Sequence, residues 1–430
     1  MNNISSIHSR ILDPVFDRKN NRVQFNFMPD TLYQSDLRLI NIGITSDNAD
    51  DSPNPILGLL GAIKRVALLD GSTLLDQLVN ADLYNSFLNS QKSNDTNSSS
   101  TRHLNFNRIG YTTSGVYTVA SDQIELNQPK INEQSPNTYS ASSMSAKRCW
   151  ISLKEMLPFL RNSIVLPTNV YKQLRLVIEY NSPAEMKYLT QATDANKETS
   201  ENALLLVEEI GDGDFKEQAM KNYKGVVFRP IEHEAVSAKA VTPTGATEQQ
   251  QNNYLVNGFN NKKLIKMVII QSPETGAIME SGNNTIGYAT MASLAQFQSQ
   301  LQVRVNGSNL LAGQGQSQST TGSGANRKLA YLNDAWGVSN IVLGQNVPNL
   351  NDYSNIVQHV DRVGQQHYLG LLVDANIQEL QINYNRTCVA NNAGTGNDLT
   401  NQALTLNIFG EVEKAVVMNK DGSYNVIYTQ

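Results

Sequence analysis

The chain has 430 residues, of which 40% are hydrophobic and 17% are charged, and its formal net charge is −5. This length exceeds what one compact core accommodates and predicts two domains. The hydrophobic fraction excludes a wholly disordered chain. The negative charge, without a run of Lys or Arg, argues against a protein that wraps nucleic acid. Asn supplies 50 residues, which is typical of a fold with many turns because Asn tolerates positive φ.

The start of the chain and its two cysteines indicate a reducing compartment. The segment Met1–Arg10 is polar, so we expect no signal peptide. The longest apolar stretch, Ile56–Ile63, is far shorter than the roughly 20 residues that span a bilayer. Cys149 and Cys388 are too few for a disulfide framework. We expect residues 1–22 to form an N-terminal arm that is free to reach a neighbouring molecule.

Apolar runs typical of β-strands recur along most of the chain, bounded by Gly, Asn, Asp and Pro. The clearest runs are Val23–Phe27, Leu37–Ile44, Ile63–Leu69, Gly115–Ala120, Leu174–Tyr180, Ala203–Val207, Leu264–Ile270, Leu301–Val305, Leu380–Tyr384, Leu404–Phe409, Val412–Val417 and Tyr424–Tyr428. Near the C-terminus, Asn419–Gly422 carries the Asp-Gly pair of a tight turn. The sequence therefore predicts an all-β fold.

Two stretches predict helices inserted between these strands. In the first, after Thr73, an apolar residue recurs every four positions, and Asp76 completes a capping box with Thr73. This apolar stripe consists of Leu75, Val79, Leu83 and Phe87. The second stretch is Ser152–Asn162. Because helices do not alternate with the strands, the pattern argues against a parallel α/β sheet.

Three polar segments predict exposed loops, and for the first and third we expect replacement by a short linker to leave folding nearly unchanged. They are Ser93–Thr101, Thr242–Asn253 and Gly313–Ala325. A further polar, Gly-bearing stretch at residues 211–225 predicts the boundary between the two domains. We therefore divide the chain into a first domain at residues 23–212 and a second at residues 213–430.

The two halves contain similar segments in the same order, which is the mark of an internal duplication. Gly71 and Gly307 each follow a strand and open a Gly-Ser-x-Leu-Leu segment. Further along, Leu174–Tyr180 resembles Leu380–Tyr384. The third pair is Ala203–Val207 and Ala403–Asn407. Any one match could arise by chance, but three in the same order favour a duplicated β-domain with longer middle loops in the first half.

The sequence contains neither a G-x-x-x-x-G-K-S/T phosphate loop nor a G-x-S-x-G nucleophile elbow. Glu232, His233 and Glu234 are adjacent and carry metal-ligand groups. Alternation along a strand, however, separates the histidine from both glutamates, which favours an ordinary solvated strand. The other histidines are scattered: His8, His103, His359 and His367.

Acidic pairs at the end of a predicted strand could suggest a glycosidase dyad. They are Glu208 with Glu209, and Asp212 with Asp214. Such a dyad needs two carboxylates at a fixed separation across a cleft, whereas acidic residues at a strand end are commonly just solvated. We therefore expect no catalytic, cofactor-binding or metal-binding residues, no cofactor, and a structural protein instead of an enzyme.

Several segments together resemble the double jelly-roll major capsid proteins of double-stranded DNA viruses, in particular those of polinton-like viruses and virophages. They are Ala62–Gly71 followed by a helix, Leu166–Thr168 leading into Leu174–Tyr180, and Phe409–Val412. The resemblance implies two tandem eight-stranded antiparallel jelly-roll sandwiches with short helical insertions. It also implies a homotrimeric, pseudo-hexagonal capsomer that tiles an icosahedral shell, located in the virion and assembled inside the host cell.

The resemblance further implies neighbouring capsomers, penton proteins and minor capsid or cement proteins as partners, without sequence-specific binding of nucleic acid. It leaves membrane contact open. The second Gly-Ser turn departs from the first, because it runs into the polar segment Gly313–Ala325 instead of a helix. A virion spike or fibre, or a carbohydrate-binding β-module, is the alternative, although two Trp residues make aromatic platforms scarce. A glycosidase is the third hypothesis.

Overall fold

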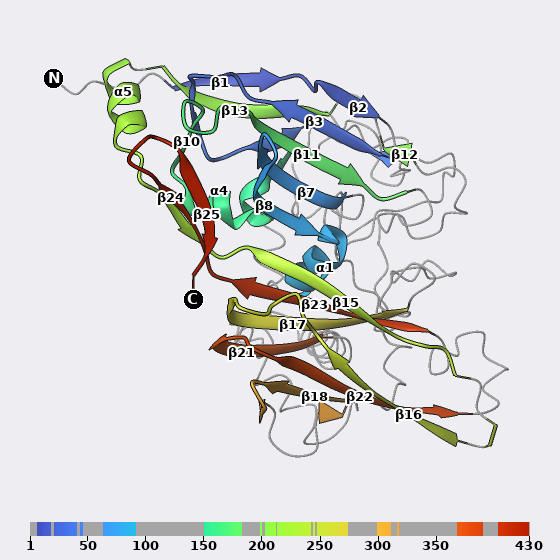
Figure 1. The fold of residues 1–430 in the computed structure, drawn as a ribbon. Helices are drawn as coiled ribbons and strands as arrows, with labels where there is room; N and C mark the ends of the chain where they lie inside the picture. The colour runs from blue at the N-terminus through green and yellow to red at the C-terminus, as the bar shows by residue number, and fades with distance from the viewer. Residues whose placement is uncertain are drawn as a thin grey trace, which may run out of the picture.

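The structure is a computed structural model of the 430-residue chain. It describes residues 7–18, 21–40, 44–45, 63–91, 150–182, 198–199, 203–211, 213–241, 244–245, 247–273, 299–310, 316–317, 368–389 and 403–429. Two β-sandwich units follow one another along the chain. The first unit occupies the upper half of Figure 1 and the second the lower half.

The first unit contains two antiparallel sheets. In one sheet the order is β10-β4-β13-β5-β9, and β1 also pairs with β13. Its strands are β1 (Ile7–Leu12), β4 (Leu32–Gln34), β5 (Arg38–Ile40), β9 (Trp150–Ser152), β10 (Val165–Pro167) and β13 (Leu204–Ile210). The other sheet has the order β2-β3-β11-β7-β8. Its strands are β2 (Phe16–Arg18), β3 (Arg22–Asn26), β7 (Ile63–Asp70), β8 (Thr73–Val79) and β11 (Leu174–Tyr180), and a separate pair joins β6 (Ile44–Thr45) to β12 (Glu198–Thr199).

The second unit also contains two antiparallel sheets, with the orders β15-β23-β17-β21 and β16-β22-β18-β19, and β20 pairs with β18. The first of these sheets comprises β15 (Ile231–Ala238), β17 (Lys263–Pro273), β21 (Tyr368–Asn376) and β23 (Leu404–Val412). The second comprises β16 (Thr247–Leu255), β18 (Ser299–Val305), β19 (Ser308–Asn309), β20 (Gln316–Ser317) and β22 (Leu380–Val389). A three-stranded sheet joins β14 (Gly225–Phe228), β24 (Lys414–Met418) and β25 (Tyr424–Tyr428).

The strand order is the same in both units. Lettered B to I in chain order, the eight principal strands are β1, β3, β5, β7, β8, β9, β11 and β13 in the first unit, and β15, β16, β17, β18, β19, β21, β22 and β23 in the second. In each unit the sheets then run B-I-D-G and C-H-E-F. This is the strand order of the jelly roll, a sandwich of eight antiparallel strands. The predicted tandem pair of eight-stranded jelly rolls is therefore confirmed.

The three repeats found in the sequence occupy equivalent places. Gly71 and Gly307 form the turn between strands E and F of their units, and both have the positive φ that glycine adopts readily (56° and 81°). Tyr180 and Tyr384 lie on the two H strands, and Ala203–Val207 and Ala403–Asn407 on the two I strands. The duplication predicted from the sequence is confirmed.

In the described part of the chain, four helical segments interrupt the sheets. They are α1 (Ala81–Gln91), the 3₁₀ turn η5 (Leu153–Glu155), α4 (Pro158–Asn162) and α5 (Gly213–Lys221). The second predicted helix is thus present but divided into η5 and α4, because Pro158 cannot continue a preceding helix. Among the described helices, none has the length and apolarity needed to cross a membrane. In the linking stretch, β13 ends at Ile210 and α5 is followed by β14.

The prediction that a helix follows Thr73 is wrong for the first seven residues. Thr73–Val79 is β8, which forms a hairpin with β7, and only α1 is helical. A spacing of four residues fits a strand as well as a helix, since it is a multiple of two. Asp76 therefore caps no helix of its own segment; its Oδ2 accepts the backbone N–H of Phe159 in α4 at 2.8 Å.

Two other expectations, a loop and a free N-terminal arm, are wrong because these polar segments form strands that pair within the sheets. The expected loop Thr242–Asn253 contains most of β16, which pairs along its whole length with β22. Residues 1–22 do not form a free arm throughout, since β1 pairs with β13 and β2 with β3. In both cases the backbone ladder forms without a continuous apolar run, because its hydrogen bonds do not depend on the side chains.

Part of the predicted pattern lies outside the described residues. This applies to Gly115–Ala120, Ser93–Thr101, Cys149, and most of Gly313–Ala325, of which β20 is described. It also applies to Asp212, His103, His359 and His367. The Asp-Gly turn near the C-terminus is confirmed: Gly422 has a φ of 82° and its N–H donates to Asn419 O.

Candidate assembly surfaces

The two units meet on the outer face of the second B-I-D-G sheet. Leu406 and Ile408 point into the core of the second unit, whereas Phe409 points the other way and packs with the core of the first. Val268 and Ile270 of β17 lie beside Phe409 and are also fully covered. We call the outward-pointing set the second outward face; it consists of Ile231, His233, Val268, Ile270, Asn407 and Phe409.

Helix α1 is the element of the first unit that covers this face, and it lies between the two units in Figure 1. Asn80 ends β8 with a φ of 50°, a conformation that Asn tolerates, and so turns the chain into α1. Ala81, Leu83 and Tyr84 are buried on the helix. The ring of Tyr84 lies 5.2 Å from that of Phe409. A local turn in the first unit thus positions the aromatic contact that joins the units.

His233 forms the polar part of the same contact. Its Nε2 lies 3.2 Å from Asn80 Nδ2 of the first unit and 3.1 Å from Asn407 Oδ1 of the second. Its ring packs 4.7 Å from Phe409. Burial lowers the pKa of His233, with the Asn407 hydrogen bond opposing the shift. The histidine that we expected on a solvated strand is therefore a neutral group packed between the two units.

A buried carboxyl and a buried ammonium lie near each other at the edge of this contact. Burial raises the pKa of Asp76 to about 7, while the Phe159 N–H and the charge of Lys414 oppose the shift. The Oδ1 atom of Asp76 has no hydrogen-bond partner among the described residues. Lys414 of β24 donates to Leu75 O at 3.4 Å, and burial lowers its pKa. The Lys414 ammonium therefore joins the C-terminal hairpin to the backbone of β8, and its charge acts on the buried carboxyl of Asp76.

An aromatic cluster fastens the C-terminal hairpin to the first unit. Phe159 of α4 packs edge-on against Phe228 of β14 at 5.3 Å. Tyr171 contacts the hydroxyl of Tyr223 at 2.8 Å. The hydroxyl of Tyr424 donates to Asp70 Oδ2 at 2.7 Å, which ties β25 to the end of β7. The last strands of the chain thus pack on the first sandwich, beside it in Figure 1.

The corresponding face of the first unit is uncovered among the described residues. Leu12, Leu39 and Leu205 point into the first core, so their neighbours along each strand point outward. We call the outward set the first outward face; it carries the apolar residues Ile7, Ile11, Ile40, Leu204, Leu206 and Ile210 together with the polar residues Ser9, Arg38 and Glu208. Ile7 and Ile11 are 49% and 52% exposed. Apolar side chains thus occupy both sides of this sheet.

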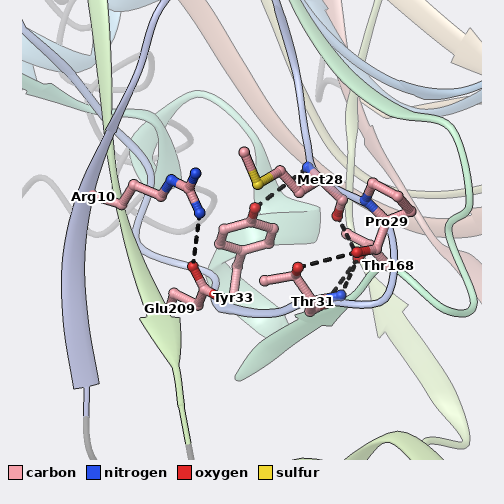
Figure 2. A network of polar contacts seen from close by, with 7 residues as sticks. All are labelled: Arg10, Met28, Pro29, Thr31, Tyr33, Thr168 and Glu209. Carbon is pink, nitrogen blue, oxygen red and sulfur yellow. Dashed lines mark hydrogen bonds and ion pairs between the residues drawn. The ribbon is translucent and has the colours of Figure 1, made fainter.

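A polar network holds the end of this sheet (Figure 2). Arg10 on β1 pairs with Glu209 on β13 at 3.3 Å. Tyr33 accepts the N–H of Met28 at 3.3 Å. Thr168 Oγ1 accepts the N–H of Thr31 at 2.8 Å and lies 2.7 Å from Met28 O. Thr168, from the segment on which the family resemblance was based, therefore joins the end of β10 to the connection between β3 and β4.

A cleft of about 560 Å³ lies between α1 and α4 of the first unit and strands of the second. Its charges are balanced: Arg229 lies 3.8 Å from both Glu411 and Glu413, and Lys266 lies 3.2 Å from Glu411. Glu411 and Glu413 of this cleft therefore each face a cation.

The candidate ligand residues, and Glu208 with Glu209, are not brought together, whereas the pair of Asp212 with Asp214 is not tested because Asp212 lies outside the described residues. Glu232 pairs with Lys262, and Glu234 accepts the N–H groups of Asn257 and Gly258, on the side opposite His233. Glu208 and Glu209 are adjacent on β13, where neighbouring side chains point to opposite faces. Within the described part of the chain, no group of three or more His, Cys, Asp or Glu residues is placed to hold a metal ion.

Sequence reasoning missed the residues that join the units. Asn80, Tyr84 and Lys414 carry no recognisable motif, and the capping box predicted for Asp76 does not form. Each of these residues acts through a contact between distant segments. One signal was present in β23, which contains Leu-Asn-Ile-Phe. Its leucine and isoleucine lie on one face of the strand, and its phenylalanine places a large apolar group on the other. An antiparallel strand that is apolar on both faces indicates burial on both sides.

Comparison with family models and with curated proteins found no match to the sequence. Solved structures do match across nearly the whole chain. The crystal structure of the mavirus major capsid protein is 11% identical with a TM-score of 0.51, covering 98% of this chain and 90% of that chain. The structure of the Sputnik virophage is 8% identical with a TM-score of 0.51, covering 98% of this chain and 88% of that chain. The faustovirus major capsid protein is 10% identical with a TM-score of 0.50, covering 97% and 92%. The chain therefore has the double jelly-roll fold that these capsid proteins share.

Proposed function

We propose that the chain is a major capsid protein that assembles as a homotrimeric, pseudo-hexagonal capsomer and tiles an icosahedral viral shell. One observation carries the proposal: two units of identical strand order are joined by a contact whose two sides are different. Three such chains present six similar units around one axis, which converts threefold symmetry into near-sixfold packing. The protein would be located in the virion and assembled inside the host cell.

The proposal includes a structural role without catalysis. The support is that Glu209, from one of the acidic pairs considered as a dyad, forms an ion pair with Arg10, while Glu208 beside it lies on the opposite face of β13. It also includes the division of the chain between residues 212 and 213, because the strands of the first sandwich end at Ile210 and α5 begins at Gly213. Further partners would be neighbouring capsomers, penton proteins and minor capsid or cement proteins.

Native mass spectrometry and electron microscopy of the purified chain test this function. We expect a stable species of three chains, and capsomer-sized or shell-like particles as concentration and salt are varied. An obligate trimer of this kind buries roughly 2,000 Å² or more at each interface. A chain that stays monomeric under every condition would contradict the capsid role and favour a β-module that binds a ligand.

A further inference from the structure

The edge strand β2 of the first unit combines a free strand edge with a pair of cations that lack a counter-charge. We propose that this edge binds an extended acidic peptide segment of another protein, which adds as a strand beside β2 and pairs its carboxylates with Arg18 and Arg22. The inference goes beyond the capsid function and does not depend on it, because the site is complete within one chain.

Arg18 and Arg22 are arranged at a cost that the sandwich itself does not require. They lie directly opposite each other on β2 and β3, and both are exposed. Like charges in this position destabilise an antiparallel pair of strands. Among the described residues neither guanidinium forms an ion pair. Asp17, next to Arg18, points to the opposite side of β2, where its Oδ1 is buried.

The neighbouring groups hold Arg22 in place without neutralising it. Its guanidinium carbon lies 4.9 Å from the centroid of the Phe16 ring, and a guanidinium that stacks on a ring keeps its N–H groups free at the edge. Glu179 lies opposite Arg22 on β11, but it already accepts a hydrogen bond from Arg65 at 3.0 Å. Arg22 is therefore a positioned donor for a carboxylate from outside the chain.

The equivalent face of the second unit shows that this chain does not need charge to keep a sheet face in water. The outward side chains of β16, β18 and β22 include the amides Gln251, Asn253, Gln302, Asn383 and Asn385. The first unit instead places Arg65 and Arg175 on this face besides the pair on β2 and β3. Among the described strands the second unit also lacks a counterpart of β2, since its sheet begins with the C strand β16. The extra strand and the cations thus occur together, which indicates a binding role.

A polypeptide fits this edge better than a nucleic acid or a polysaccharide. Among the described strands β2 pairs with β3 alone, and an unpaired strand edge readily accepts a further strand. Only a polypeptide supplies the N–H and C=O groups that continue such a ladder. The strand lies on the side of the first unit remote from the second (Figure 1), so the second unit does not cover it.

The side chains of β2 indicate the sequence that such a peptide should have. Phe16 and Arg18 lie two residues apart and point to the same face, and Phe16 is 39% exposed. Directly opposed residues on neighbouring strands have Cβ atoms about 5 Å apart. The peptide should therefore carry an acidic residue opposite Arg18 and an apolar residue opposite Phe16. The acidic residue then lies in the same row as Arg22.

Selection of peptides on the purified full-length chain tests this site. A phage-displayed library of random heptapeptides is selected on the protein, and the enriched peptides are synthesised with a fluorescein label. We expect an acidic and an apolar residue at alternate positions, and binding that weakens at least tenfold in the double variant Arg18→Gln/Arg22→Gln, because charge-assisted hydrogen bonds are lost.

The matched control is Lys221→Gln/Lys224→Gln, which removes two exposed cations at α5 and directly after it. This variant should bind the peptides as the wild type does. Enriched peptides without acidic residues, peptides whose affinity is the same in the arginine variant, or an absence of enrichment would overturn the inference.

Hydrogen exchange distinguishes strand addition from a general attraction of anions. The peptide should slow amide exchange at Phe16–Arg18 at least tenfold, because the added ladder protects the edge. Heparin and a single-stranded oligonucleotide are the comparison probes, and neither should protect these amides. If heparin or the oligonucleotide binds with the same dependence on the arginines and the peptide gives no protection, the edge binds polyanions and the inference is wrong.

Arg18→Gln alone separates a binding role from a packing role. Because the substitution removes the repulsion between directly opposed cations, we expect the midpoint of denaturant unfolding to stay the same or to rise. A lower midpoint would show that the guanidinium stabilises the sandwich, against the inference. If the double variant fails to fold, peptide binding by Arg18→Gln decides. A trimer that forms without peptide binding refutes this site alone, and a chain that binds the peptide but stays monomeric refutes the capsid function alone.

Discussion

The two B-I-D-G sheets have the same strand order, yet their outer faces have different surroundings. In the second unit α1 covers Phe409, and His233 bridges to Asn80. In the first unit Ile7 and Ile11 remain about half exposed. The difference shows that duplication supplied one fold twice, whereas the position along the chain decides which copy of a surface is satisfied internally. The uncovered copy is therefore left without a partner element among the described residues.

Truncating Phe409 should destabilise the protein, because this residue lies on the covered outer face. Its side chain is fully buried and contacts both Tyr84 and His233, so Phe409→Ala should lower the free energy of unfolding by about 3–5 kcal/mol. Ile11→Ala on the uncovered face should change it by no more than about 0.5 kcal/mol. Denaturant unfolding of both variants measures the difference, and equal losses would contradict the assignment of covered and uncovered faces.

The buried carboxyl of the junction should give stability a pH dependence that the uncovered face lacks. Burial raises the pKa of Asp76 to about 7, above its value of 3.8 in the unfolded chain. The native state therefore binds an extra proton between these values, and the free energy of unfolding should decrease as pH rises from about 4 to about 7. The charged groups that act on Asp76 are Lys414 of β24 and Arg161 of α4.

Asp76→Asn should remove this decrease, because the amide oxygen still accepts the Phe159 N–H but the side chain no longer titrates. Unfolding measured at pH 5, 6 and 7.5 would detect the change. Asp374→Asn serves as the control, since the Asp374 side chain is 66% exposed. An identical pH slope in wild type and Asp76→Asn would show that the carboxyl is already ionised in the native state.

His233 should have a smaller effect of the opposite sign. Burial lowers its pKa below the usual 6.5, so the unfolded state binds more protons near and below pH 6.5, and stability is lost as pH falls. His233→Gln should abolish this loss. The exposed His8 on β1 provides the control His8→Gln on the equivalent strand of the first unit. A melting temperature with the same acid dependence in wild type and His233→Gln would contradict the burial of a neutral imidazole.

Strands with continuous apolar residues were predictable, whereas polar edge strands were not. β11 and β25 have the predicted bounds because their apolar residues are flanked by turn-forming residues. The sequence predicts a loop over most of β16 because seven of its nine residues are polar, whereas its place in the sheet depends on pairing with β22, more than 100 residues away. Local sequence does not contain information on such a distant pairing.

The repeat was predictable as a set of equivalent strands, but its register was not. Aligning Ala203–Val207 with Ala403–Asn407 identifies the two I strands correctly. Val207 points into the first core, however, while Asn407 points outward to His233. A shift of one residue exchanges the two faces of a strand, so the alignment alone could not indicate which residues form the outward faces. The junction itself depends on contacts such as Lys414 with Leu75, which sequence patterns do not contain.

The smallest expected effect concerns how firmly β1 is held in the sheet that carries the first outward face. Arg10 and Glu209 form an ion pair at 3.3 Å, with side chains 41% and 25% exposed. Exposed pairs contribute between about 0.2 and 1 kcal/mol and weaken with salt, so Arg10→Ala should lower stability by at most about 1 kcal/mol. A double-mutant cycle with Glu209→Gln at low and high salt measures the coupling.

The ladder to β13 and the buried Leu12 should keep β1 in place in the variant. Hydrogen exchange at Ile7–Leu12 as slow as in wild type would agree with this expectation, whereas complete and rapid exchange would mean that the ion pair alone holds the strand that carries the face.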